Sequence, residues 1–188
     1  VLLWSAIHPH DYFTWLLEIA PAVIAFILLA ATYKRFPLSN VSYTLIALHA
    51  CILIVGGHYT YAEVPLFNYL RDIGWFARNN YDKIGHFAQG FIPAIVAREV
   101  ILRRTPIKRG GWLALFTVSI CLAASAIYEL IEWGVSVATG SAGDSFLGTQ
   151  GYIWDTQSDM LMAFLGSVTA LLLLSRLHDW SMKKVVGR

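Results

Sequence analysis

Five apolar segments, each long enough to cross a lipid bilayer, dominate this chain of 188 residues. A helix rises about 1.5 Å per residue, so about 20 apolar residues span the roughly 30 Å hydrocarbon core of a membrane. The segments run approximately over Tyr12–Tyr33, Val41–Gly57, Asp82–Leu102, Gly111–Ala138 and Asp155–Leu177. Helices are expected, because an open strand in lipid leaves its backbone polar groups unpaired. The sequence therefore predicts an all-α, polytopic transmembrane bundle of five full helices.

The composition supports one membrane domain over residues 1–188. Only 14% of the residues are charged, whereas a soluble domain has about 25%, and the shortage extends along the whole chain. The opening stretch VLLWSAI is typical of the end of an apolar helix that begins upstream, which adds a partial N-terminal helix. Cys51 and Cys121 lie in apolar segments and are expected to pack as small hydrophobic residues. No P-loop is present, and the basic residues are scattered at helix ends, so no nucleic-acid partner is expected.

The basic residues favour one orientation in the membrane. Lys and Arg concentrate in alternate connections: Lys34 and Arg35; Arg103, Arg104, Lys108 and Arg109; Arg176, Lys183, Lys184 and Arg188. Because basic connections face the cytoplasm, the C-terminus is expected to be cytoplasmic in a bacterial inner membrane. The aromatic segment 58–81 then lies outside, where a short amphipathic helix is expected at the membrane interface. The glycine-rich segment Thr139–Trp154 is also outside, and it is expected to fold back over the helix ends as a lid or a re-entrant loop.

Polar pairs recur at the expected outer ends of three helices. Each pair has helical spacing, which places both side chains on one helix face: Asp82 with His86, Glu129 with Glu132, and Asp155 with Asp159. His58 follows the second apolar segment at the same depth. Facing helices that contribute carboxylates and imidazoles build metal sites in bundle cores. We therefore expect an outward-facing polar pocket between three helices.

The chemistry of this group favours a divalent metal ion. Several carboxylates cannot all ionise close together unless a cation compensates them. Imidazole with carboxylate oxygens suits Zn²⁺, Mn²⁺ or Fe²⁺. The candidate metal ligands are His86, Glu129, Asp159, Asp82, Asp155 and His58. The candidate catalytic residues are Glu129 and Glu132, while Arg78 and Lys83 are cations that would compete with a metal.

Structural roles are open for several of these residues. Asp82 and Asp155 each begin an expected helix, where an N-cap or an interaction with the helix dipole is sufficient explanation. Carboxylates inside a membrane, such as Glu129 and Glu132, suggest function by default. Glu18 is expected to reach toward the interface. The isolated His49 is expected to be a hydrogen-bonded packing residue.

Four motifs give the chain a family resemblance: GGHYTYAEVPLF, RNNYDKIGHFAQGFIPAIVAREV, YELIEW and FLGTQGYIWDTQSDM. Together they resemble the YjdF-like family of bacterial inner-membrane proteins over nearly the whole chain. That resemblance implies the architecture and leaves the activity open.

The chain is more weakly similar to VanZ-like membrane proteins, which are linked with teicoplanin resistance. The pattern D-K-x-x-H is matched at Asp82, Lys83 and His86, and later positions at Glu129 and Asp159. Glu132, where those proteins commonly have Gln, and the additional Asp155 depart from it. The similarity therefore implies a polar site between three helices, without implying antibiotic resistance.

Three classes of function are compatible with this sequence. The first is metal- or carboxylate-assisted hydrolysis or group transfer on a lipid or envelope substrate, in which a metal-activated water attacks and a glutamate is the general base. The second is a non-catalytic accessory or structural subunit of a larger membrane complex, in which the polar residues fix helix packing. A transporter with a carboxylate relay is the third, and the absence of an internal repeat argues against it.

Overall fold

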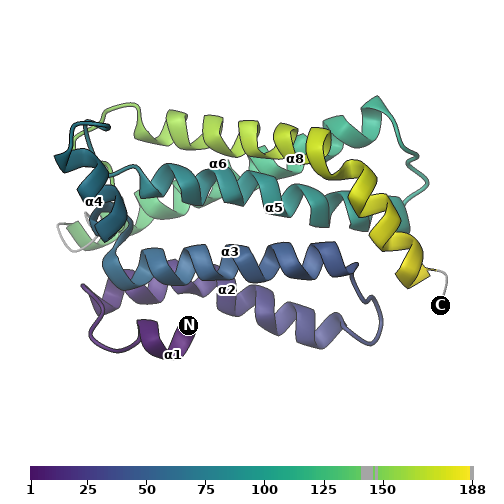
Figure 1. The fold of residues 1–188 in the computed structure, drawn as a ribbon, viewed down its shortest axis with the longest axis horizontal. Helices are drawn as coiled ribbons and strands as arrows, with labels where there is room; N and C mark the ends of the chain where they lie inside the picture. Colours follow the sequence, from purple (N-terminus) through teal and green to yellow (C-terminus); the bar gives the residue numbers. More distant parts are fainter. Residues whose placement is uncertain (141–145, 147, 187–188) are drawn as a thin grey trace.

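The computed structural model describes all residues of the chain except 141–145, 147 and 187–188. Its elements are all helical: α1 (Leu2–Ser5), α2 (Tyr12–Thr32), α3 (Asn40–Tyr59), the 3-10 helix η1 (Tyr61–Glu63), α4 (Pro65–Asp72), α5 (Tyr81–Arg104), α6 (Gly111–Thr139) and α8 (Asp155–Val186). The described part of the chain thus confirms the predicted all-α bundle, drawn in Figure 1.

Four of these helices, α2, α3, α6 and α8, are long and apolar enough to cross a membrane. Helix α5 has 24 residues, which is also a spanning length, but it is more polar. The five expected helices are therefore all present. Helix α8 has 32 residues and continues to Val186, so the tail expected after Leu177 is instead helical.

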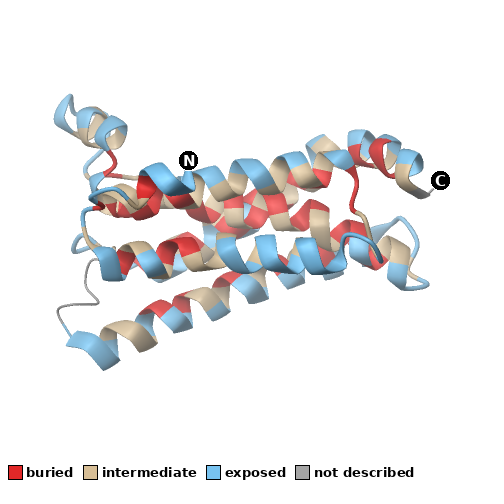
Figure 2. Cartoon of the chain, turned by 90° about the horizontal axis from the view of Figure 1, so that it is seen from below, coloured by how far each residue is buried: buried red, intermediate tan, exposed pale blue. Residues whose placement is uncertain are grey.

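The polar helix α5 occupies the centre of the bundle. It packs along α8 and also contacts α6 and α3, and Figure 2 shows the buried residues concentrated in this central region. Lipid-facing positions on the outer helices are apolar, for example Phe26, Leu130 and Leu172. A charged helix is tolerated here because its polar groups find partners on neighbouring helices instead of facing lipid.

Local sequence signals set the starts of the first two long helices. The Asp11 carboxylate accepts from the Thr14 backbone N–H at 2.7 Å, and the Ser39 hydroxyl accepts from that of Ser42 at 3.3 Å. Each bond satisfies an N–H group that has no partner within its helix.

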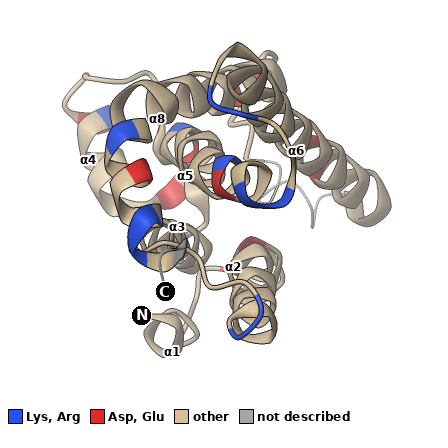
Figure 3. Ribbon diagram, turned by 90° about the vertical axis from the view of Figure 1, so that its right-hand side faces the viewer, with Lys and Arg blue, Asp and Glu red and all other residues tan. Residues whose placement is uncertain are grey.

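The two ends of the bundle differ in charge. One end, called the α4 end, holds η1, α4 and the first turns of α5 and α8, on the left of Figure 1. The opposite end holds connections 33–39 and 105–110 and the last turns of α8. Lys and Arg gather around this opposite end, called the basic end, in Figure 3.

The aromatic segment at the α4 end forms the short helix that was expected. Helix α4 exposes Leu66 and Tyr69, and Trp75 and Phe76 are exposed just after it. These side chains are suited to the headgroup region of a bilayer.

Candidate functional site

Helices α5 and α8 bring a histidine and two aspartates together at the α4 end. Asp82, His86 and Asp159 each offer one ligand atom, and these atoms all lie within 4.8 Å of one another. His86 Nε2 is 3.2 Å from Asp82 Oδ1 and 3.9 Å from Asp159 Oδ1. The one-turn spacing of Asp82 and His86 on α5 places both beside the start of α8, where Asp159 projects inward.

Gln89 and Glu129 surround the other nitrogen of His86. His86 Nδ1 donates to Gln89 Oε1 at 2.9 Å, and Glu129 Oε1 from α6 lies 3.6 Å from Nδ1. Donation from Nδ1 leaves Nε2 as the nitrogen that can ligate a metal. Glu129 is only 5% exposed, and its Oε1 has no hydrogen-bond partner among the residues that the structure describes.

Two cations already neutralise part of this site. Lys83 Nζ lies 2.6 Å from Asp159 Oδ1, 2.8 Å from Asp155 Oδ1 and 3.6 Å from Asp82 Oδ2. Arg78 Nη2 donates to Asp155 Oδ1 at 2.6 Å. Lys83 therefore binds carboxylates that a metal ion would also need, which is the competition that the sequence suggested. Asp155 is held by Lys83 and Arg78 at one side of the group, so the structure does not bring it to the histidine.

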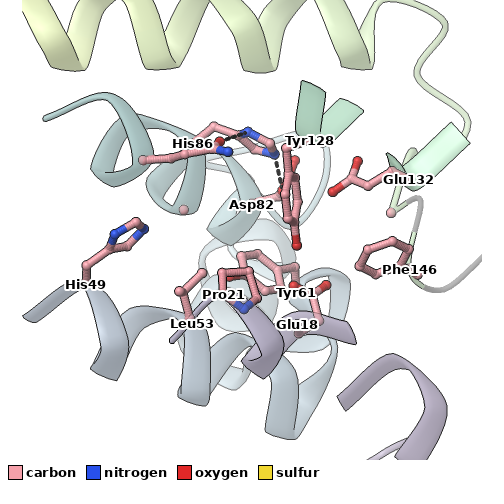
Figure 4. A pocket seen from close by; sticks show the side chains of 13 residues that line it. Glu18, Pro21, His49, Leu53, Tyr61, Asp82, His86, Tyr128, Glu132 and Phe146 are labelled. Atoms are coloured by element: carbon pink, nitrogen blue, oxygen red, sulfur yellow. Dashed lines mark hydrogen bonds and ion pairs between the residues drawn. The ribbon is translucent and has the colours of Figure 1, made fainter. Parts of the chain in front are cut away.

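A cavity of about 60 Å³ lies beside the group (Figure 4). Its polar walls come from four helical elements and one 3-10 turn: Glu18 from α2, His49 from α3, Tyr61 from η1, Asp82 and His86 from α5, and Tyr128 and Glu132 from α6. Glu132 thus faces the cavity, while Glu129 faces the histidine. A space of this size holds a few water molecules.

Glu18 does not reach toward the interface as the sequence suggested. It is only 4% exposed and lines the cavity together with Glu132. Its helix α2 is otherwise apolar around it, so no pattern along the chain indicates a partner. Only the packing of α2 on α3 turns this carboxylate inward.

Tyr61 is a second residue that sequence analysis missed. Its ring packs against Gly56 and Gly85, where a Cβ atom on either glycine would overlap the ring. The two glycines therefore make room for an aromatic side chain that closes one wall of the cavity.

The structure places two other histidines outside the group. His58 Nδ1 donates to the Ser5 carbonyl at 3.0 Å, and its ring packs 4.3 Å from that of Trp4. His58 therefore joins α1 to α3 and is not brought to the candidate metal ligands. His49 borders the cavity, but its Nε2 is buried without a partner in the described part of the chain, contrary to the hydrogen-bonded role expected.

The expected lid falls partly outside the described residues, at 141–145 and 147. Its described remainder covers the start of α5. Gln150 Oε1 accepts from the Asn79 backbone N–H at 3.2 Å, and Gln150 Nε2 donates to the Asn79 carbonyl at 2.8 Å. Arg78 donates to the Thr149 carbonyl at 2.8 Å.

A second polar cluster, near the basic end, was also missed. Glu99 is fully buried and accepts from Arg103 at 2.7 Å and from the Ser42 hydroxyl at 2.7 Å, with His178 Nε2 at 3.1 Å. Arg98 joins His178 to Asp179. The adjacent charged residues Arg98 and Glu99, within an otherwise apolar stretch, are the sequence feature that could have predicted this cluster. Every polar atom of Glu99 has a partner, so this cluster ties α3, α5 and α8 together.

Comparisons with known proteins agree with this membrane architecture. A family model described as a predicted membrane protein, DUF2238, matches residues 1–180. The inner membrane protein YjdF of Escherichia coli (strain K12) is 48% identical over 178 residues, which cover 95% of this chain and 85% of that protein. No solved structure matches. The similarity to VanZ-like proteins stays a prediction, because neither match concerns that family.

Proposed function

The chain belongs to the DUF2238 family of predicted membrane proteins, and we propose that its polar site binds a divalent metal ion. This site lies in a multi-pass protein of the bacterial inner membrane. Asp82, His86 and Asp159 are the proposed ligands, and Glu129, beside the other ring nitrogen of His86, adds a further buried carboxylate to the site. When bound, the ion would supply an activated water for hydrolysis of a lipid or envelope substrate.

One observation carries the proposal. Three ligand atoms converge within 4.8 Å, and a buried carboxylate oxygen without a partner among the described residues, Glu129 Oε1, points at the same histidine. An orphaned carboxylate oxygen in a buried site costs free energy unless a proton or a cation compensates it. A metal ion at Asp82, His86 and Asp159 would bring positive charge into this site and would use a ligand set that Zn²⁺, Mn²⁺ and Fe²⁺ accept.

The balance of charge supports the same conclusion. Six carboxylates border the site: Glu18, Asp82, Glu129, Glu132, Asp155 and Asp159. Among the described residues, the opposing positive charges are Lys83, Arg78 and, when protonated, His86. A divalent ion at Asp82, His86 and Asp159 would share Asp159 with Lys83, which also contacts Asp155.

The chemistry proposed is hydrolysis, for which a divalent ion held by Asp82, His86 and Asp159 would supply an acidified water. Glu132, which lines the cavity, would take a proton from the water; the water oxygen would bond to phosphorus or to a carbonyl carbon as the bond to the leaving oxygen breaks, and that oxygen would receive the proton. The cavity holds a few water molecules but is far smaller than a ligand pocket of about 300–1,000 Å³. The substrate group must therefore reach the metal from the membrane or the α4 end.

Metal analysis of the detergent-purified protein tests the proposal. Wild-type protein is expected to hold about one Zn, Mn or Fe per chain by elemental analysis, and His86→Ala and Asp159→Asn are expected to reduce this to background, because each removes one of few ligands. Glu132→Gln is expected to keep the metal. Hydrolysis is assayed by mass spectrometry on a bacterial lipid extract, and any hydrolysis found with the wild type is expected to be lost in this variant.

His58→Ala is the matched control, since this histidine also lies at the α4 end but binds Ser5. It should retain the wild-type metal content. Wild-type protein without metal, after growth and purification in metal-supplemented buffers, would refute the proposal. Loss of metal in His58→Ala to the same degree as in His86→Ala would refute the assignment of ligands.

The contacts of Lys83 support a second candidate function, in which the protein is a structural subunit of a larger membrane complex. These contacts, with Asp155, Asp159 and Asp82, join α5 to α8 without any metal. Purification in mild detergent distinguishes the two, because this alternative requires a stoichiometric partner subunit and no bound metal.

A further inference from the structure

An apolar groove of about 490 Å³ runs along the outside of the bundle between α2 and α5. Helix α3 packs against both of these helices and forms the base of the groove. Its walls are aliphatic, and include Leu28, Leu29, Ile46, Ile92, Val96 and Val100. This volume is about eight times that of the polar cavity, and the groove has no part in the proposed metal site.

The groove has the length of one membrane leaflet. Its α5 wall extends from Ile92 to Arg104, which is about 18 Å along a helix that rises about 1.5 Å per residue. Half of a hydrocarbon core of about 30 Å is about 15 Å. His49 lines the groove and also borders the polar cavity, so it marks the end of the groove away from the basic end.

The groove carries a positive charge where it reaches the basic end. Arg104 is exposed there, with its guanidinium 4.6 Å from the centre of the Phe36 ring, which also lines the groove. No hydrogen bond or ion pair within the described part of the chain engages Arg104, whereas its neighbour Arg103 is bonded to Glu99. Phe36 therefore orients a guanidinium that remains available to an anion at the basic end.

We infer that this groove binds an anionic phospholipid, with one acyl chain between α2 and α5 and the phosphate at Arg104. A leaflet-long apolar groove fits the acyl chain, and the guanidinium matches the headgroup in charge and in depth. Arginine is well suited to phosphate because its planar donors bind two oxygens at once. The inference is independent of the proposed metal site, which lies at the α4 end.

Native mass spectrometry of the purified full chain tests this site, with phosphatidylglycerol and phosphatidylcholine titrated separately. Wild-type protein should retain phosphatidylglycerol in preference to the zwitterionic lipid. Arg104→Gln should weaken retention of phosphatidylglycerol about fivefold, as expected for one basic residue at a membrane surface, and should abolish the preference. Val100→Trp should reduce retention of both lipids, because the indole fills the groove.

Two controls separate this site from general attraction to lipid. Lys108→Gln removes an exposed charge at the same end, and Val137→Trp enlarges an exposed valine on α6, outside the groove. Both should behave as wild type. Equal retention of phosphatidylglycerol by wild type and Arg104→Gln, or equal effects of Val100→Trp and Val137→Trp, would overturn the inference. Metal content should be unchanged in all four variants, so either proposal can fail alone.

Discussion

Lys83 is the residue on which the charge balance of the site depends. Its ammonium contacts aspartates from two helices, Asp82 beside it on α5 and Asp155 and Asp159 on α8. The lysine side chain is only 15% exposed and Asp159 only 3%, so water screens these contacts weakly. Removing one partner of a buried pair leaves an uncompensated charge, which is the costly outcome.

Lys83→Gln is therefore expected to lower the free energy of unfolding by about 3–5 kcal/mol in metal-free buffer. Denaturation in detergent containing a chelator measures the loss, and added Zn²⁺ or Mn²⁺ should restore part of it by replacing the missing charge. The control is Arg71→Gln, whose ion pair with Asp72 is largely exposed and is worth about 0–1 kcal/mol. Equal stability of the two variants would show that Lys83 does not hold the site together.

Among the elements, the contact of α5 with α8 decides whether the site assembles. The two backbones approach closely at two glycines: a Cβ atom on Gly90 would overlap the Ala163 carbonyl, and one on Gly166 would overlap the backbone of Phe87. Small residues permit such approaches between membrane helices. The candidate ligands Asp82 and His86 lie one to two turns before Gly90, so this approach also sets their distance from Asp159.

Gly90→Ala is expected to destabilise the bundle by about 1–3 kcal/mol, because the added methyl group pushes α8 away. It should also weaken metal binding, since Asp159 moves with α8. Thermal unfolding and metal titration measure the two effects. Gly134→Ala on α6 is the matched control: its Cβ would meet no atom within 4 Å, so stability should stay within about 1 kcal/mol of wild type. If the Gly90→Ala variant matched the wild type in stability and in metal binding, the proposed role of the close approach would be contradicted.

For the whole molecule, the separation of charge between the two ends has the greatest consequence. The connections at the basic end carry Lys and Arg (Figure 3), and the candidate site and its carboxylates lie near the α4 end. If the basic end is cytoplasmic, the proposed metal site draws its ion and substrate from the outer side of the membrane. The groove at Arg104 then faces the cytoplasmic leaflet, where anionic lipid makes the surface negative.

Cysteine labelling tests this orientation. Asp72→Cys and Lys108→Cys, both at exposed positions, are made separately in a chain with Cys51→Ala and Cys121→Ala. In intact spheroplasts a membrane-impermeant maleimide should label the first variant only, because its thiol lies outside. Both should react after lysis, which serves as the control for thiol reactivity. Labelling of the Lys108→Cys variant in intact spheroplasts would reverse the orientation.

Local patterns in the sequence were sufficient to predict the long helices of this protein. Apolar length predicted five membrane helices, and the helical spacing of Asp82 with His86 and of Asp155 with Asp159 predicted which side chains share a helix face. These features could be predicted because the bilayer requires each segment to satisfy its own backbone hydrogen bonds, so the information is contained within one stretch of chain. The continuation of α8 to Val186 was missed because Lys and Arg interrupt the apolar pattern there.

Which polar side chains meet depends instead on the packing of helices that are distant in sequence. This packing turned Glu18 into the cavity, assigned Asp155 to Arg78 and Lys83, and kept His58 with Ser5. The physical reason is that a helix contributes one face to its neighbours, and which neighbour that face meets depends on packing among helices far apart in sequence. The close approach of α5 and α8 at Gly90 is such a contact, and through it local patterns become one site.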